Sequence, residues 1–339
     1  EVLGQGGMAR FQEMLRTVQH IRQRRMKEIT SAASIPAFLA AKWPRATAGI
    51  TEKVDAETVL RLWDAFDIAE ADLAACEGCK GLDECTLRYK GMRQVVLEQN
   101  GALYQMLSPC RYMQAQMDEE VRRRRLQSAR LERKFWERTF DVYEPTNESQ
   151  RQALERCRAW AEEYKPKETR SGLLIVGPVG VGKTHLAAAI LLRIMERYPD
   201  VQPMMLPMID FLEELRDTVG MEDESWNAKV DDAVRAPVLV MDDLGGNLEW
   251  QKTEDGRFLL KPNSRGQHPV TDFESRTLYR LINRRYEAGR PVIITTNCPL
   301  EVLELAYGVR TVSRIIEMTD GILVTGGDFR KRKLAGFGG

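Results

Sequence analysis

Apolar and polar positions follow two different patterns along this chain, and the pattern changes near residue 140. Before this point, apolar residues recur at helical spacing. Met8–Ile29 is typical of an amphipathic helix with many basic residues, and Glu57–Phe66 of a second helix. After it, short continuous apolar runs, typical of buried strands, alternate with helical stretches. These runs cover residues 172–176, 203–208, 237–241, 291–295 and 321–325.

Five apolar runs separated by helices predict an α/β fold, in which a parallel sheet of about five strands lies between two layers of helices. We expect this domain over residues 140–333 and a small, mainly helical domain over residues 8–115, with a native start at Met8. Residues 116–139 are predicted to be a basic linker, and the simplest interpretation of its charge is a solvated connecting helix. The polar segment Gly245–Phe273 is expected to be a long loop that is either functional or mobile.

Composition excludes few classes of function. Among the 339 residues, 50 acidic residues balance 50 basic ones, so affinity for nucleic acid cannot be argued from the whole chain. No apolar stretch reaches the ~18–20 residues that cross a bilayer, and no signal peptide opens the chain. We therefore expect a cytoplasmic protein with no membrane partner, whose six cysteines are thiols or metal ligands rather than disulfides.

A glycine-rich run, Gly177–Thr184, follows the first apolar strand directly and precedes the helical run His185–Leu192. The pattern G-x-x-x-x-G-K-T, in the order strand, loop and helix, predicts a phosphate-binding loop. Its backbone N–H groups can curl around phosphates, and the helix N-terminus adds its positive end. Lysine would neutralise phosphate charge, and the threonine hydroxyl would bind Mg²⁺. The predicted contacts to a nucleoside triphosphate are Gly177, Gly180, Gly182, Lys183, Thr184 and His185.

Two carboxylates, Asp242 and Asp243, end the third apolar run. A buried parallel strand delivers its last residues to the sheet edge where ligands bind. Asp242 is suited to hold the magnesium shell through water, and Asp243 to orient or deprotonate the attacking water. Many ATPases with a phosphate-binding loop have Glu at the position of Asp243. Because Asp is one methylene shorter, we expect slow hydrolysis of the nucleoside triphosphate. Asn297 follows the fourth run and is expected to face the γ-phosphate if that strand lies between the other two.

Together with the segment Gly308–Ile316, these motifs resemble the AAA+ ATPase core of bacterial replicative-helicase loaders of the DnaC/DnaI type, over residues 140–333. The resemblance implies an ATP-switched protein that binds the hexameric replicative helicase and places it on single-stranded DNA during replication initiation or restart. It also implies assembly into a hexamer, or an open ring or spiral, on the helicase. In this resemblance Asn297 is the sensor-1 residue, Arg314 the arginine finger with Arg310 as its alternative, and Arg330 a sensor-2 residue that contacts ATP.

A cluster of cysteines lies in the first domain, with C-x-x-C spacing at its start. Two thiols at this spacing can chelate one ion from a single turn, and four thiolates complete a tetrahedral zinc site with no open position. We therefore predict a structural Zn²⁺ site; a redox pair and unrelated buried cysteines are the alternatives, although no thioredoxin-like βαβ pattern surrounds the motif. Cys157 and Cys298 are expected to be core or surface thiols. The predicted ligands are Cys76, Cys79, Cys85 and Cys110.

The cysteine spacing also resembles the zinc-binding N-terminal domain of DnaI-type primosomal loaders, which implies that residues 8–115 dock on the helicase. Two other functions stay open. The chain could be a helper ATPase of transposition of the IstB type, acting on duplex DNA with a transposase, although that family lacks such a cluster. It could also be a nucleotide-gated adaptor that binds ATP and hardly hydrolyses it, for which Asp243 is the motivating residue.

Overall fold

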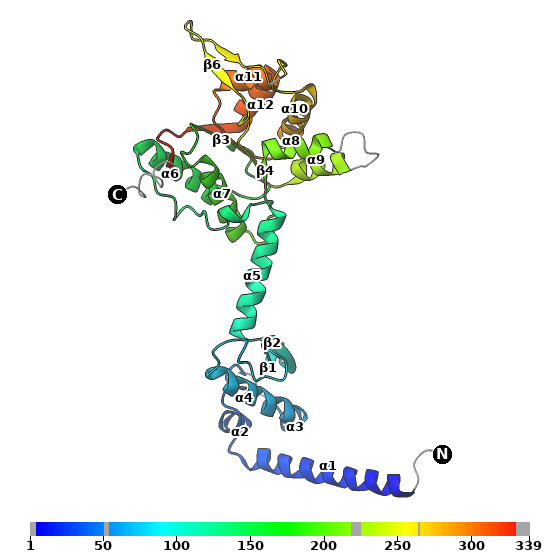
Figure 1. Ribbon diagram of the computed structural model, residues 1–339. Coiled ribbons are helices and arrows are strands. Elements are labelled where there is room, and N and C mark those ends of the chain that lie inside the picture. Colours follow the sequence, from blue (N-terminus) through cyan, green and yellow to red (C-terminus); the bar gives the residue numbers. More distant parts are fainter. Residues whose placement is uncertain (1–4, 51–53, 218–224, 264, 330–339) are drawn as a thin grey trace. The chain divides into compact units, whose positions relative to one another are not determined.

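The computed structural model describes residues 5–50, 54–217, 225–263 and 265–329 (Figure 1). The chain divides into two compact units, Glu1–Val121 and Arg122–Gly339. Nowhere in these described ranges is a helix apolar and long enough to cross a membrane.

The first unit is built on helices that pack around aromatic side chains. Ser34 and Asp55 cap two of these helices, because each side chain accepts a hydrogen bond from the backbone N–H three residues later. In the core, the ring of Trp43 stacks on Phe66 at a centroid distance of 4.9 Å and meets Trp63 edge-on at 5.0 Å. The predicted helix Met8–Ile29 is confirmed, and the predicted helix Glu57–Phe66 is divided at Leu62. The helices are α1 (Gln5–Ser31), α2 (Ile35–Lys42), α3 (Ala56–Arg61) and α4 (Trp63–Glu77).

A β-hairpin that the sequence did not predict completes this unit. Strands β1 (Met92–Gln99) and β2 (Ala102–Pro109) pair antiparallel around Asn100 and Gly101. Both turn residues have positive φ, 53° and 74°, as a type I′ turn requires. Strand β1 contacts α4, and Val96 and Leu103 on one face of the hairpin are buried, whereas Tyr104 on the other face is 54% exposed. The unit is therefore less helical than expected.

The second unit contains the predicted sheet. Its five strands run parallel in the order β4-β5-β8-β3-β9. Successive residues of these apolar strands point to opposite faces: Leu173 and Ile175 pack with α6 and α7, and Leu174 packs with α8–α12. Burial on both faces explains why the central strands β3, β5 and β8 are mostly apolar, whereas the edge strand β9 is largely exposed. The α/β three-layer prediction is confirmed (Figure 1). The strands are β3 (Gly172–Val176), β4 (Met204–Pro207), β5 (Leu239–Asp242), β8 (Val292–Thr296) and β9 (Thr319–Leu323).

The helices of this unit include the one that follows the phosphate loop, α7. Thr271 caps α10 in a capping box with Glu274, which explains where that helix begins. The helices are α5 (Arg111–Ser128), within which the division between the units falls, η1 (Arg133–Phe135), α6 (Glu148–Glu163), α7 (Lys183–Arg197), α8 (Met208–Asp217), α9 (Ser225–Arg235), α10 (Asp272–Glu287), α11 (Leu300–Tyr307) and α12 (Val309–Met318).

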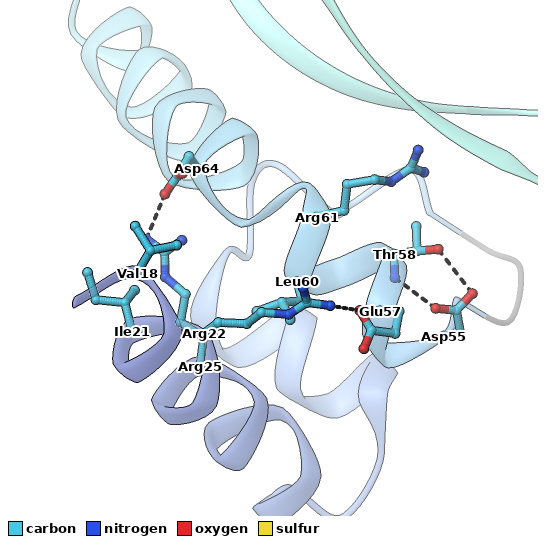
Figure 2. A pocket seen from close by; sticks show the side chains of 10 residues that line it. All are labelled: Val18, Ile21, Arg22, Arg25, Asp55, Glu57, Thr58, Leu60, Arg61 and Asp64. Atoms are coloured by element: carbon cyan, nitrogen blue, oxygen red, sulfur yellow. Dashed lines mark hydrogen bonds and ion pairs between the residues drawn. The ribbon is translucent and has the colours of Figure 1, made fainter. Parts of the chain in front are cut away.

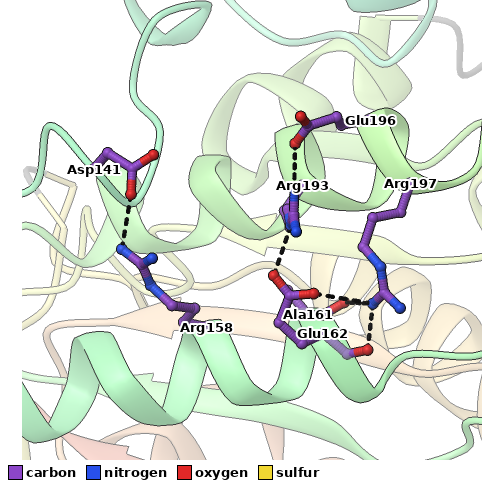
Figure 3. A network of polar contacts seen from close by, with 7 residues as sticks. All are labelled: Asp141, Arg158, Ala161, Glu162, Arg193, Glu196 and Arg197. Atoms are coloured by element: carbon purple, nitrogen blue, oxygen red, sulfur yellow. Dashed lines mark hydrogen bonds and ion pairs between the residues drawn. The ribbon is translucent and has the colours of Figure 1, made fainter.

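Arginines at the end of α7 fasten it to α6 (Figure 3). The Arg193 guanidinium binds Glu162 at 2.7 Å and Glu196 at 2.6 Å. Arg197 donates a hydrogen bond of 2.8 Å to the backbone oxygen of Ala161, at the C-terminal end of α6. Exposed ion pairs contribute little individually, but a donor to the last carbonyls of a helix satisfies groups that have no partner within it. This network holds α7, the helix that follows the phosphate loop, against α6.

The start of the second unit includes part of the segment 116–139, for which a linker was predicted. Leu126, Ala129 and Leu131 are buried in the same core as α6 and α7. Arg125 donates to the backbone oxygen of Met195 near the C-terminal end of α7 at 3.0 Å. The chain is thus already packed on the second unit before residue 140.

The prediction of a long loop over Gly245–Phe273 is wrong for its middle part. Short strands β6 (Trp250–Lys252) and β7 (Phe258–Leu260) form an antiparallel hairpin there, which lies beside α11 (Figure 1). The rings of Trp250 and Phe258 meet edge-on at 5.3 Å. The turn contains Gly256 with φ 85°, which a glycine adopts without strain. Trp250, Phe258 and Leu260 also pack against the core of the unit, so a few apolar residues order a segment that is polar in composition.

Candidate functional site

The glycine loop connects β3 to α7 in the predicted way. Gly182 is the N-cap of α7 and has a left-handed backbone, with φ 96°. A Cβ at this position would lie 2.7 Å from the ring of Tyr143, and one at Gly180 would lie 1.9 Å from Oδ1 of Asp328. Only glycine therefore fits at both places. Because Gly182 has no side chain to cap α7, the first N–H groups of this helix suit an anion.

Lys183, the first residue of α7, reaches back over the loop. Its side chain is 7% exposed, and Nζ donates a hydrogen bond of 2.9 Å to the backbone oxygen of Pro178. The ammonium group is thus held above the glycines, where phosphate charge would collect.

The carboxylate of Asp242 faces the beginning of the same helix. It is the last residue of β5 and is 8% exposed. Burial raises the pKa of Asp242, whereas hydrogen bonds from Thr295 and Thr184 and the charge of Lys183 oppose this shift. The hydroxyl and the carboxylate that were expected to share a magnesium ion are therefore in contact.

Asp243 lies at the turn that leaves β5. Its φ of 54° is unusual for a residue other than glycine. The backbone oxygen accepts a hydrogen bond from Gly246 N at 3.0 Å, and a Cβ at Gly246 would lie 2.1 Å from Oδ2 of Asp243. The exposed carboxylate thus lies close to the backbone of Gly246.

Strand β8 lies between β3 and β5, as the placement of Asn297 required. The backbone oxygen of Thr296 accepts a hydrogen bond from Gly177 N at 3.2 Å, and its hydroxyl donates one of 2.7 Å to the backbone oxygen of Leu244. The next residue, Asn297, is partly exposed, and its Oδ1 accepts a hydrogen bond from the Cys298 thiol at 3.3 Å. The end of β8 therefore connects the phosphate loop to the carboxylate turn.

His185 lies near the start of α7 but makes its contacts with another part of the unit. Its Nε2 is 2.9 Å from the backbone oxygen of Thr139, and its ring meets Tyr143 edge-on at 5.1 Å. The Tyr143 hydroxyl in turn donates to the backbone oxygen of Val181 at 3.0 Å. Burial lowers the pKa of His185. These contacts place His185 beneath the loop, and a contact to nucleotide stays a prediction.

The arginines predicted from the resemblance do not share the surroundings of the glycine loop in the described residues. Arg314, on α12, lies over the ring of Tyr286 at 4.4 Å, and the Tyr286 hydroxyl donates to the carboxylate of Glu317. Arg310 on the same helix is exposed. Arg330 lies outside the described residues.

The four clustered cysteines of the first unit line one cavity of about 310 Å³. Two of their sulfurs accept backbone hydrogen bonds, Cys85 from Gly91 N at 3.2 Å and Cys110 from Met113 N at 3.5 Å. Burial, and then the neighbouring Cys110, raise the pKa of the Cys76 thiol. In the described part of the chain, however, no three or more His, Cys, Asp or Glu side chains are grouped as a metal site requires. Cys157 and Cys298 are buried.

Two residues of this site have no role in the sequence analysis, Thr295 and Tyr143. Thr295 binds both acidic residues, and Tyr143 supports the loop from below. Thr295 stands in a Thr-Thr-Asn strand end, which is a polar ending on an otherwise apolar strand. This polar ending was a signal in the sequence that Thr295 belongs to the site, whereas the sequence around Tyr143 gave no such signal.

Comparisons with known proteins match the same part of the chain. Residues 132–259 match the family described as the bacterial DnaA ATPase domain. The chain is 27% identical over 172 residues to Rv3427c of Mycobacterium tuberculosis, a protein in an insertion sequence whose name describes it as ATP-binding; 48% of this chain and 57% of that protein are covered. It is 27% identical over 145 residues to the chromosomal replication initiator protein DnaA of Kosmotoga olearia, covering 41% of this chain and 26% of that protein. The chain thus spans little more than half of one relative and about a quarter of the other.

Two solved structures are also similar. The DnaC helicase loader is 27% identical, with a TM-score of 0.46 and coverage of 57% of this chain and 99% of that one. DnaI is 21% identical, with a TM-score of 0.43 and coverage of 58% of this chain and 93% of that one.

The segment that matches DnaA contains both the glycine loop and the Asp242–Asp243 pair. The strand order brings these two motifs to the same edge of the sheet, on either side of β8. Residues 132–259 are therefore similar to the ATPase domain of bacterial DnaA, and they hold a glycine loop and an acidic pair at one edge of a parallel sheet.

Proposed function

We propose that this chain is an ATPase that loads the replicative DNA helicase onto single-stranded DNA. The observation that carries the ATPase part is that Lys183, Thr184 and Asp242 meet at the glycine loop. The loader part is supported by the match to the DnaA ATPase domain and by the resemblance of the sequence motifs to helicase loaders. Because the relatives match only over part of their length, the helicase and single-stranded DNA are part of this proposal.

In this function the triphosphate lies in the glycine loop, with its negative charge against Lys183 and the N-terminus of α7. Thr184 and Asp242 would hold Mg²⁺, which supplies positive charge to the phosphate oxygens when bound. Asp243 orients the attacking water or takes its proton, and Asn297 contacts the γ-phosphate or that water. These groups come from three different strands, so the chemistry depends on the register of the sheet.

Arg314 acts, in this proposal, on the nucleotide of a neighbouring subunit. The Arg314 guanidinium stacks on the ring of Tyr286, which supports it at the surface of α12. Among the described contacts, Glu317 on the same helix binds the Tyr286 hydroxyl and not the arginine. An arginine finger supplied in this way increases the rate by about 10³–10⁵-fold where it has been measured. Hydrolysis would then depend on assembly into a hexamer, or an open ring or spiral, on the helicase. Arg330 would contact the same nucleotide as a sensor-2 residue.

We further propose that Cys76, Cys79, Cys85 and Cys110 bind a structural zinc ion. The donor set fits, because the four thiols share one cavity and backbone N–H groups already point at two of the sulfurs. In the described residues the four cysteine side chains are not grouped as a metal site requires. To bind zinc, they would have to move together around one ion. When bound, zinc contributes folding energy to the domain that holds it.

The first unit is the part that we expect to dock on the helicase. Helix α1 exposes an apolar row at helical spacing, with Met14 at 52% and Val18 at 55% of their accessible surface. Further along α1, a groove of about 750 Å³ opens against α3, lined by Val18, Ile21 and Leu60 (Figure 2). Ion pairs of 2.9 Å between Arg22 and Glu57 and 2.6 Å between Arg25 and Asp64 border it. Exposed apolar surface with a charged border is typical of interaction sites.

The test is to mix the full chain with the hexameric replicative helicase of its host and to measure the mass of the complex by native mass spectrometry, with and without ATP. A defined complex that is lost when residues 8–115 are removed supports the loader function and gives the stoichiometry. The matched control is the isolated second unit, which should still bind ATP.

A second function, helper ATPase of transposition, is favoured by one observation, the similarity to a protein in an insertion sequence. In that function the ATP-bound chain would assemble on duplex DNA and contact a transposase. Filament formation on duplex but not on single-stranded DNA, together with no helicase complex under any nucleotide condition, would decide for it. A turnover assay with and without single-stranded DNA separates both functions from an adaptor that binds ATP without hydrolysing it.

A further inference from the structure

A single buried hydroxyl connects the two acidic residues of the site. Thr295 has no exposed surface. Its Oγ1 donates a hydrogen bond of 2.6 Å to Oδ1 of Asp242 and accepts one of 2.8 Å from the backbone N of Asp243. One side chain thus binds the carboxylate of the first residue and the backbone of the second.

The register of the sheet produces this arrangement. The ladder between β5 and β8 ends with the pair Met241 and Ile294, so that Asp242 and Thr295 are the next residues on the two strands. The backbone oxygen of Thr295 also accepts a hydrogen bond from Leu244 N at 2.9 Å. Beyond the last ladder pair, Thr295 therefore connects β8 to the end of β5 through both its backbone and its side chain.

Such a contact has a specific use at Asp243. A left-handed backbone in a residue other than glycine is strained and persists only where its surroundings fix it. The hydrogen bond from Asp243 N to Thr295 supplies such a constraint at the strained residue itself. A hydroxyl has one proton and two lone pairs, so the proton given to Asp242 leaves an acceptor for this N–H. Serine offers the same two functions, and valine neither.

We propose that Thr295 is a positioning residue, which orients the carboxylate of Asp242 toward Mg²⁺ and fixes the backbone of Asp243 for the attacking water. The proposal rests on the ATPase function proposed above. Thr295 acts through the two acidic residues and needs no contact with the nucleotide itself.

The test compares Thr295→Val, which keeps the shape and removes the hydroxyl, with Thr295→Ser. For each full-length protein we would measure the Mg²⁺ concentration that half-saturates binding of a fluorescent ATP analogue, the affinity for that analogue in EDTA, kcat, and the thermal midpoint. Thr295→Val should need roughly 10-fold or more additional Mg²⁺ and lose roughly 10- to 100-fold in kcat, since it removes a hydrogen bond to a charged group. Its affinity in EDTA should stay within about twofold, because the glycine loop is untouched. Thr295→Ser should behave like the wild type.

The matched control is Thr47→Val in the first unit. Thr47 is also buried, and its hydroxyl donates to a backbone oxygen, that of Trp43, at 2.8 Å. It should change neither the Mg²⁺ requirement nor kcat. If Thr295→Val does not fold, Thr295→Cys replaces it, because a thiol is a weak donor and should give an intermediate Mg²⁺ requirement.

A folded Thr295→Val or Thr295→Cys protein with the Mg²⁺ requirement and kcat of the wild type would overturn the inference. So would a serine variant as impaired as the valine variant, because that result would show that the hydroxyl alone does not maintain the site. A wild-type chain that binds no nucleotide would instead overturn the proposed function, and the inference with it.

Discussion

Lys183 Nζ is bound to the backbone oxygen of Pro178, five residues earlier in the same glycine loop, at 2.9 Å. The loop therefore holds its own cation in place. Because the lysine is almost fully buried, a phosphate that enters the loop meets an ordered ammonium group and does not have to immobilise a flexible side chain.

Replacing this lysine should remove nucleotide binding. Lys183→Ala deletes the charge that faces the phosphates, and we expect the affinity for ATP to fall by roughly 100-fold or more, since hydrogen bonds to charged groups are among the strongest. Isothermal titration with ATP and Mg²⁺ measures this. The control is Lys167→Ala, on the loop before β3, which should bind ATP as the wild type does. Retained affinity in Lys183→Ala would remove the assignment of the loop.

Arg314→Ala should separate binding from hydrolysis. The side chain contacts Tyr286 on α10, and no part of the glycine loop is among its described contacts. We therefore expect unchanged affinity for ATP and a loss of roughly 10³-fold in the assembly-dependent rate, as for other arginine fingers. Phosphate release at increasing protein concentration shows whether the rate depends on assembly. An unchanged rate would direct attention to Arg310, for which Arg310→Ala is the parallel variant.

Cys79→Ser should release zinc from the first unit and weaken binding to the helicase, while leaving ATP binding intact. The reason is that the proposed site would lose one of its four thiolate ligands, and structural zinc stabilises the fold that holds it. Metal content by mass spectrometry is the measurement. Cys157→Ala is the control, because Cys157 is a fully buried thiol of the second unit, and burial raises its pKa to about 12. Wild-type zinc content in Cys79→Ser would exclude the cluster as the site.

The stability of the second unit should decrease in mild acid because of His185. Burial holds the pKa of His185 below its ordinary value of 6.5, so the folded state favours the neutral ring. The unfolded chain takes up a proton as the pH falls through about 6.5, and the folded state does so only at lower pH; the free energy of unfolding therefore decreases over this range. Urea unfolding at about pH 7.5 and about pH 5.5 should show a smaller decrease for His185→Gln than for the wild type. Equal decreases in both proteins would contradict this.

The elements that the sequence predicted well are those with one dominant physical cause. The strand Leu239–Asp242 is apolar up to its last residue because both of its faces are buried, and the acidic residue at its end marks the sheet edge. The two hairpins were missed although each has a turn signal, Asn100-Gly101 and Asp255-Gly256. In both cases polar or charged residues interrupt the strands, so that composition suggested helix or loop where cross-strand pairing decides.

The polar strand end was a signal for Thr295, but its contacts could not have been assigned from the sequence. Its partners Asp242 and Asp243 are more than fifty positions away, and the contact exists only because β8 is inserted between β3 and β5 in one register. A shift by one residue would turn the hydroxyl to the other face of the sheet. Motifs indicate which groups take part, whereas strand order and register determine which of them touch.

The hydrogen bonds that connect Thr296 to Gly177 and Leu244 have an evolutionary consequence. Both go to backbone atoms: an N–H at position 177, which every amino acid other than proline provides, and a carbonyl oxygen at position 244, which every amino acid provides. The side chain at position 244 is therefore free to drift among relatives as far as this contact is concerned, while position 296 must retain a hydroxyl. We expect an alignment of homologues to show threonine or serine at 296 beside a variable apolar residue at 244.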